Sequence, residues 1–129
     1  MRVVLDTNVV VSAFLSPAGV PAIIVRLALN RDLDICVNAA ILAEYEQVLV
    51  RPKFSDRIHH SDIQRFMEIV YNIGVKIDAL PSQINSIDET DRKFFDLAVA
   101  ADAALITGNK KHFPTEPFVY EPAAFLKTR

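Results

Sequence analysis

Short apolar runs alternate along the chain with longer segments in which apolar residues recur every three or four positions. The short runs predict buried strands over residues 3–5, 33–37, 75–77, 104–107 and 118–120. The longer segments predict helices over residues 20–29, 39–49, 62–72, 89–101 and 122–126. Because strands alternate with helices, the sequence predicts an α/β fold built on a mainly parallel sheet.

Cap and stop residues define the ends of three of these helices. Asn38 is a favoured N-cap for the helix over 39–49. Ser61 and Asp88 are expected to cap the next two helices, and Gly74 to end the first of that pair. The polar, basic segment 51–60 is predicted to be a loop or a clamp.

The composition narrows the class of protein. A chain of 129 residues, 51% of them apolar, is expected to form a single domain over residues 1–129. Cys36 is the one cysteine, so a reducing compartment is expected. With no signal-peptide pattern and no apolar run of about 18 residues, we expect a cytoplasmic protein that does not enter membranes. A net charge of −2 excludes tight nucleic-acid binding by overall charge, so such binding needs local basic patches or cations.

Polar residues follow two of the predicted strands. Asp6 comes directly after the strand over 3–5, and Asn109 lies just beyond the strand over 104–107. Ligand sites of open α/β sheets lie beyond the carboxyl ends of the strands, which makes both residues candidates. The alternative for Asp6 is a turn former or helix cap, and for Asn8 an N-cap.

Two glutamates flank the apolar stripe of the helix over 39–49. Glu44 borders Ile41 and Val48, whereas Glu46 lies on the other side of the stripe. Each is about 100° from the centre of the stripe on the helical period. The periodicity does not choose between them, and either one can be a solvated flanking carboxylate.

Asp91 shares a helical face with Phe94 and Phe95, so its carboxylate is expected to point toward the core side. A capping box is the competing interpretation, with Asp88 as the N-cap and Asp91 satisfying first-turn amides. Both interpretations can hold together. Asp96 lies well round the helix, where a solvated or supporting acid is expected.

Converging carboxylates require compensation, because like charges a few ångströms apart repel by several kcal/mol, about 4 kcal/mol at 4 Å and an effective dielectric of 20. Their pKa values rise or a divalent cation binds among them. Oxygen ligands without clustered cysteine or histidine favour Mg²⁺ or Mn²⁺ over Zn²⁺. Such a site suits hydrolysis of a phosphodiester bond.

Four segments together resemble the PIN-domain family, and most of all its VapC-type toxins. They are V-V-L-D-T-N-V (3–9), I-L-A-E-Y-E-Q-V-L (41–49), D-R-K-F-F-D-L-A (91–98) and L-I-T-G-N-K-K-H-F (105–113). The resemblance implies a three-layer α/β/α fold with a five-stranded parallel sheet. It also implies an RNA substrate, a cognate antitoxin and a homodimer.

The resemblance carries over residue by residue. It places the catalytic and metal-binding acids at Asp6, Glu44 and Asp91, and supporting polar residues at Asn8 and Thr107. The fourth acidic position of the family falls on an amide, so this chain departs from the fullest pattern and its second metal site is in doubt. The amide at this position is Asn109, which the resemblance implies is a metal ligand through its carbonyl oxygen.

Two basic groups are candidate nucleic-acid contacts. Lys110, Lys111 and His112 follow the strand over 104–107, and Arg51 and Lys53 follow the helix over 39–49. The alternative for both groups is a set of solvated surface charges.

Two other functions compete with the nuclease. A haloacid-dehalogenase-like, Mg²⁺-dependent phosphatase begins with D-x-D, but here Asn8 stands at the second acidic position. A PIN fold that only binds RNA or protein is the other alternative, supported by Asn109. Metal-dependent cleavage that requires Asp6 separates the nuclease from such a binding module.

Overall fold

The computed structural model describes residues 1–81 and 87–129 and contains a five-stranded sheet in the order β3-β2-β1-β4-β5. Every neighbouring pair of strands is parallel, which confirms the predicted parallel sheet. The strands are β1 (Arg2–Leu5), β2 (Asp34–Val37), β3 (Val75–Lys76), β4 (Ala104–Ile106) and β5 (Val119–Tyr120). Each predicted strand is found with a boundary within one residue.

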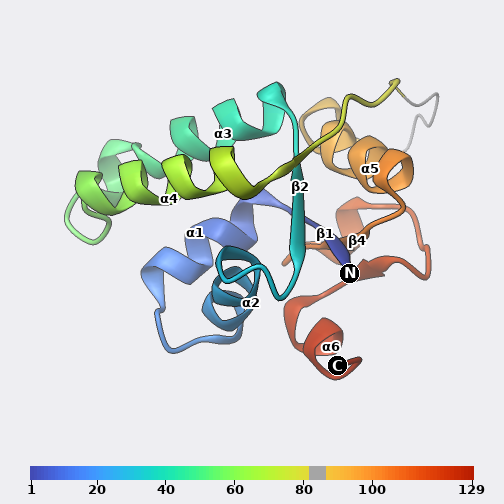
Figure 1. The fold of residues 1–129 in the computed structure, drawn as a ribbon, viewed down its shortest axis with the longest axis horizontal. Coiled ribbons are helices and arrows are strands. Elements are labelled where there is room, and N and C mark those ends of the chain that lie inside the picture. The colour runs from blue at the N-terminus through green and yellow to red at the C-terminus, as the bar shows by residue number, and fades with distance from the viewer. Residues whose placement is uncertain (82–86) are drawn as a thin grey trace.

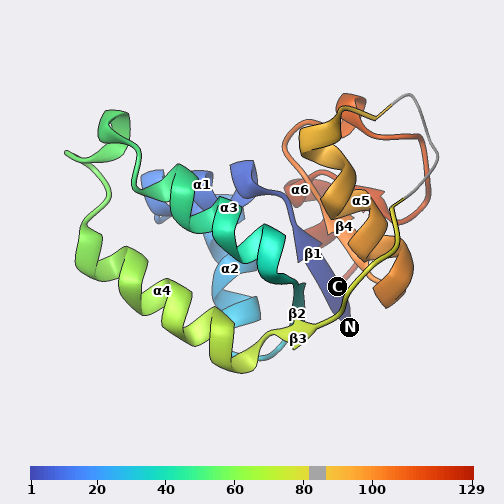
Figure 2. The same ribbon diagram turned by 90° about the horizontal axis from the view of Figure 1, so that it is seen from above.

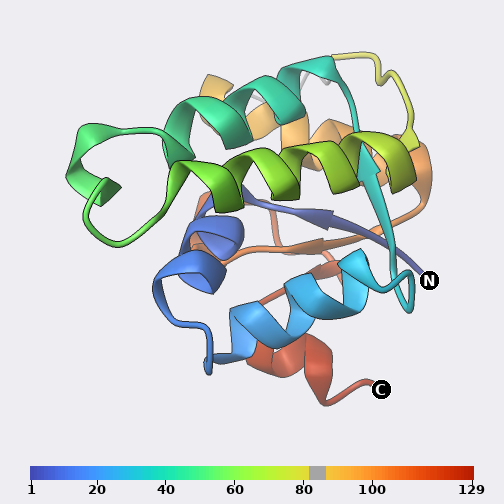
Figure 3. The same cartoon turned by 60° about the vertical axis from the view of Figure 1, so that its left-hand side comes forward.

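Helices cover both faces of this sheet, giving the three layers expected of the fold. Figures 1 and 3 show α3, α4 and α5 on one side and α1, α2 and α6 on the other. The helices are α1 (Thr7–Leu15), α2 (Val20–Leu29), α3 (Ala39–Leu49), α4 (His60–Ile73), α5 (Glu89–Ala101) and α6 (Pro122–Leu126). Within the described residues no single helix has the length and apolar character of a membrane span, although α1 and α2, bent by 106°, meet that test as a pair.

Two features depart from the predicted helices. The helix α1 was not predicted, because its start is rich in β-branched residues such as Val9 and Val10, which favour strands. It forms because its apolar side chains are buried beneath α2 and α3, so tertiary packing overrides local propensity. The prediction of Ser61 as a cap is wrong: α4 begins at His60, and His59 takes the N-cap position without a side-chain hydrogen bond.

The Asn38 cap is confirmed, and it fixes where α3 starts. Its Oδ1 accepts a hydrogen bond from the Ile41 N–H at 3.0 Å. Helix α3 then packs against α1, and the two overlap in Figure 2. Its far end leads into the short 3-10 helix η1 (Pro52–Phe54), which lies inside the basic segment.

The strand β1 is the central strand of the sheet, and the order of the strands switches sides at this strand. Val3, Val4 and Leu5 are completely buried. From β1 the chain proceeds to β2 on one side, and β4 later adds on the other side. At the carboxyl ends, Leu5 is paired with Ile106, and the Asp6 N–H donates to the Ile106 carbonyl at 2.9 Å. A crevice at such a switch point is the expected place for a ligand site.

Candidate functional site

Asp6 lies at this switch point, buried with only 6% of its surface exposed. It occupies the N-cap position of α1, but its side chain makes no capping hydrogen bond. Its Oδ2 instead accepts a hydrogen bond from Thr107 Oγ1 at 2.7 Å and another from Asn8 Nδ2 at 3.3 Å. The carboxylate is therefore held between Thr107, just beyond β4, and Asn8, in the first turn of α1.

Burial raises the pKa of Asp6 above its ordinary value. The hydrogen bond from Thr107 opposes that rise, whereas the negative charges of Asp91 and Glu44 add to it. The carboxylate of Asp6 thus lies in the electrostatic field of two other acids, although all three are far apart in the sequence.

A second set of hydrogen bonds joins the ends of β1 and β4. Asn8 Oδ1 accepts from the Gly108 N–H at 3.0 Å, and Thr107 Oγ1 accepts from the Asn109 N–H at 3.0 Å. Asn8 therefore donates to Asp6 through its Nδ2 and accepts from the loop after β4 through its Oδ1. The Thr107 hydroxyl both donates to Asp6 and accepts from that loop. The predicted supporting residues lie where they orient Asp6. The side chain of Asn109 is exposed at the start of the 3-10 helix η2 (Lys110–His112).

The structure distinguishes the two glutamates of α3. Glu44 is half-buried and accepts a hydrogen bond from Thr7 Oγ1, the residue after Asp6. Lys93 on α5 places its Nζ 2.6 Å from the other oxygen of Glu44. Glu46 is exposed. Glu44 is thus the α3 carboxylate that faces the ends of the strands.

Tyr45, the next residue, holds α3 against the central strand. It is completely buried, and its hydroxyl donates to the Leu5 carbonyl at 2.5 Å. Since Leu5 precedes Asp6 and Tyr45 follows Glu44, this bond joins the backbone beside one acid to the residue beside the other.

Asp91, in the first turn of α5, completes the acidic group. Its carboxylate is 19% exposed and lies 3.6 Å from His112 Nδ1. Burial raises the pKa of Asp91, His112 lowers it, and Asp88 and Glu44 raise it further. The capping-box alternative is not seen, because the Asp88 side chain makes no capping hydrogen bond.

Compensating cations stand beside two of the three acids. Lys93 pairs with Glu44, and His112, when protonated, pairs with Asp91. Within residues 1–81 and 87–129, no three His, Cys, Asp or Glu side chains come close enough to enclose a metal ion together. The donors nevertheless fit Mg²⁺ or Mn²⁺, because Mg²⁺ commonly takes one or two carboxylates and keeps several waters. Among the described residues, neither Asp6 nor Asp91 forms an ion pair with a lysine.

A family profile described as PIN domain matches residues 2–111. The chain belongs to the PIN-domain family. PIN domains are generally nucleases, and this assignment displaces the phosphatase alternative. The chain is also 29% identical to an uncharacterized protein, MJ1680, of Methanocaldococcus jannaschii, over 85% of this chain and 72% of that protein.

One solved structure shows the same fold. It is the crystal structure of VapBC2 from Rickettsia felis bound to a DNA fragment from their promoter, with a TM-score of 0.60 and 19% identity. The match covers 94% of this PIN domain and 98% of that chain. At this identity the likeness establishes the three-layer architecture.

The basic residues of the PIN domain lie in two places around the acids. Arg51 and Lys53, at η1, line a cavity of about 560 Å³ that Glu44 and Asp91 also line. Lys110 and Lys111 are exposed on η2 beside His112. The predicted basic groups therefore flank the acidic group from two sides.

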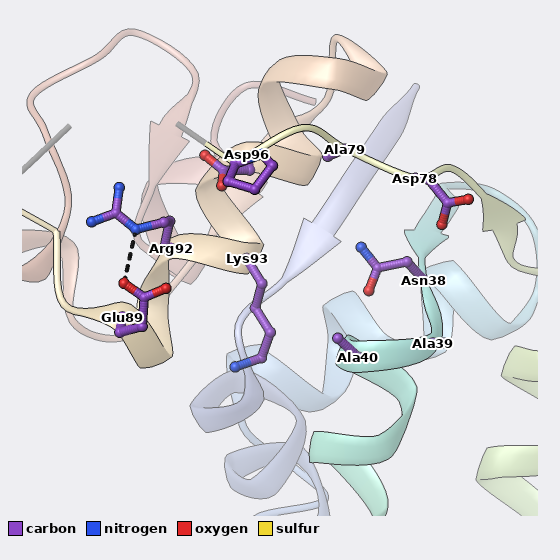
Figure 4. A pocket seen from close by; sticks show the side chains of 10 residues that line it. Asn38, Ala39, Ala40, Asp78, Ala79, Glu89, Arg92, Lys93 and Asp96 are labelled. Carbon is purple, nitrogen blue, oxygen red and sulfur yellow. Dashed lines mark hydrogen bonds and ion pairs between the residues drawn. The ribbon is translucent and has the colours of Figure 1, made fainter. Parts of the chain in front are cut away.

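Asp96 is buried, 8% exposed, so the expectation of a solvated acid is wrong. Figure 4 shows it lining a different cavity, of about 320 Å³, with Asn38 from α3 and Lys93 from its own helix. Lys93, which also lines this cavity, reaches Glu44 with its ammonium.

Sequence reasoning missed three residues that hold the site together: Thr7, Tyr45 and Lys93. Thr7 follows Asp6 directly, and its hydroxyl is the one nearby signal that was available. Lys93 is two residues from Asp91, a spacing that points it elsewhere on the helix. Its contact with Glu44 depends on how closely α5 approaches α3, which no local pattern encodes.

Proposed function

We propose that this PIN domain is an endoribonuclease that requires Mg²⁺ or Mn²⁺ and hydrolyses RNA phosphodiester bonds. Asp6, Glu44 and Asp91 are the proposed catalytic residues, and Asn8 and Thr107 support them. Asn109 is proposed to add a neutral metal ligand. The observation that supports this function most is that Asp6, Glu44 and Asp91, from three separate elements, lie near the carboxyl ends of β1 and β4. The negative charges of Asp91 and Glu44 both raise the pKa of Asp6.

Each residue has a task that its contacts suggest. A bound divalent ion would neutralise charge on the phosphodiester and acidify water. Thr107 and Asn8 hold the Asp6 carboxylate in one orientation, so little reorganisation is needed when a cation arrives. Lys93 forms an ion pair with Glu44 and holds it in place beside Thr7. Side chains held in one orientation can position the reacting phosphate and the attacking water, and such positioning is the main requirement of phosphoryl transfer.

The direct test is cleavage of a labelled RNA pool by the purified chain in Mn²⁺, in Mg²⁺ and in excess EDTA. Asp6→Asn keeps an oxygen that can accept from Thr107 but removes the charge. Asp102→Asn is the matched control, because Asp102 is exposed and its left-handed backbone, with φ 52°, suits asparagine. We expect cleavage only with metal, a loss of at least a hundredfold in Asp6→Asn and unchanged activity in Asp102→Asn. Equal activity of the two variants would refute the proposal.

A binding module without catalysis is the second candidate. The observation that favours it is that Lys93 and His112 already compensate Glu44 and Asp91 without a metal. Asn109 supports it too, because the amide adds no charge. Under this alternative, Asp6→Asn binds RNA as tightly as the natural chain, and neither protein cleaves it in any metal.

We further propose that the chain is the toxin of a toxin–antitoxin pair, acts in the cytoplasm and forms a homodimer. The VapBC2 structure supports the kind of partner, since that complex is bound to DNA from its own promoter. Expression in a bacterial host is expected to stop growth, and Asp6→Asn to restore it. Co-expression with the protein encoded next to this chain is expected to give a complex of measurable mass, whereas normal growth with the active chain alone would contradict the toxin role.

A further inference from the structure

The cavity lined by two of the acids and by η1 also has basic and apolar side chains in its lining. Its acidic end is Glu44 and Asp91, and its basic end is Arg51 and Lys53. Residues of α1 and α3 line the rest of it, and along α3 Glu44 comes before Val48, with Arg51 just beyond the end of the helix. The volume of about 560 Å³ falls in the range of roughly 300–1,000 Å³ that is typical of small-molecule sites.

The lining from α1 and α3 has an apolar part with polar groups beside it. Val11 and Val48 are half-buried side chains that face the cavity from α1 and α3. Ser12 and Gln47 stand beside them. In the part of the chain that the structure describes, the side chains of Ser12 and Gln47 make no hydrogen bond or ion pair. An apolar face beside open donors and acceptors matches a nucleobase, which has flat apolar faces and a polar edge.

The basic end matches a phosphate. Arg51 and Lys53 are exposed, and among the described residues neither pairs with an acid. The Lys53 ammonium lies 5.1 Å from the centre of the Phe54 ring, which keeps it at the rim of the cavity. Acids at one end and free cations at the other fit successive phosphates of a strand, one at the proposed reaction centre and one held by charge.

We propose that this cavity binds one unpaired nucleotide of the RNA, adjacent to the bond that is cut, and that Gln47 and Ser12 select its base. This proposal rests on the nuclease function proposed for the acids. A base in a duplex already uses its Watson–Crick edge, so the cavity accepts a nucleotide from a single strand. Gln47 and Ser12 set the base preference, and Arg51 and Lys53 add affinity without regard to sequence.

The binding test uses the whole chain in EDTA, so that its result does not depend on catalysis. Fluorescence anisotropy with short single-stranded RNAs of A, C, G or U measures the preference among bases. We expect one base to be favoured by on the order of tenfold. The double variant Ser12→Ala/Gln47→Ala is expected to lose that preference, whereas Gln64→Ala, on the exposed face of α4, keeps it. An unchanged preference in the double variant, or no RNA binding by the natural chain, overturns the proposal.

A second variant separates charge from base selection. Arg51→Ala/Lys53→Ala is expected to weaken binding to all four RNAs by the same factor and to reduce the salt dependence of binding by one to two phosphate contacts. Lys127→Ala, an exposed lysine beyond α6, is the charge control. A change in base preference in Arg51→Ala/Lys53→Ala would contradict the division of roles.

Cleavage mapping in Mn²⁺ tests the same cavity during the reaction. Cuts in a structured RNA are expected only at unpaired nucleotides, and Ser12→Ala/Gln47→Ala is expected to change the nucleotide beside the cut. Cuts in duplex RNA, or unchanged cut sites in the variant, overturn the nucleotide site while leaving the nuclease intact. The absence of all cleavage instead refutes the nuclease, and the binding measurements then decide on the cavity alone.

Discussion

Replacing Tyr45 by phenylalanine removes one hydroxyl from the core and leaves the ring in place. The ring keeps its contact with Phe66, whose centroid lies 6.2 Å away. The lost group is the donor to the Leu5 carbonyl at 2.5 Å, and both residues are completely buried. A buried acceptor that loses its donor costs about 1–3 kcal/mol, so we expect the free energy of unfolding to fall by that amount.

The measurement is thermal unfolding followed by far-UV circular dichroism. For a domain of this size a change of 1 kcal/mol corresponds to about 4 °C in Tm, so a fall of about 4–12 °C is expected. Tyr71→Phe is the matched control, because Tyr71 is 61% exposed and its loss of a hydroxyl should change stability by less than about 0.5 kcal/mol. Equal unfolding midpoints for the two variants would refute the reasoning.

The pH dependence adds a second check. Burial, together with the charges of Asp6 and Glu44, raises the pKa of Tyr45 well above its ordinary value of 10.0. The folded chain therefore keeps the phenol proton where the unfolded chain loses it. Stability from this group is constant below the unfolded pKa and declines only as the pH rises above about 10. The penalty in Tyr45→Phe should consequently be the same at pH 6 and pH 9.

Two further perturbations test the acidic group and the packing. Asp6 has a raised pKa, so the folded chain binds its proton more tightly than the unfolded chain, and metal-free stability falls as the pH rises from about 4 through the folded pKa. Asp6→Asn should lessen that fall, leaving the part due to Asp91, whose pKa is also raised, and should be the more stable protein at pH 7 in EDTA. Mn²⁺ should raise the Tm of the natural chain only, and calorimetry with and without metal checks both outcomes. Gly74→Ala should destabilise by about 1–3 kcal/mol, because its Cβ would lie 2.7 Å from the Val70 carbonyl and 2.8 Å from Val37 Cγ2, and an unchanged urea midpoint would contradict this.

The sequence predicts the fold well where local signals agree with packing. Four helices have the predicted bounds. In α3, for example, the cap residue Asn38 stands directly before the first residue of the apolar repeat, so both signals give the same start. The helix α1 fails this test: Val9, Val10 and Val11 favour a strand, and only the end of β1 at Asp6 and the burial under neighbouring helices impose a helix.

The candidate site was predictable only in part. Position after a strand singles out Asp6, and helical period turns Asp91 inward, but the period leaves Glu44 and Glu46 equivalent. The resemblance to PIN domains chose Glu44, and its contact with Thr7 agrees. The ion pair with Lys93 depends on the distance between two helices, which is set by the whole core.

The bond between Thr107 and Asp6 joins residues 101 positions apart. During synthesis the central strand β1 is made about a hundred residues before its neighbour β4. A chain that stops early has an open edge on β1 and no partner to orient its first acid. Under the proposed function, a chain released between β1 and β4 would therefore lack the oriented carboxylate on which cleavage depends.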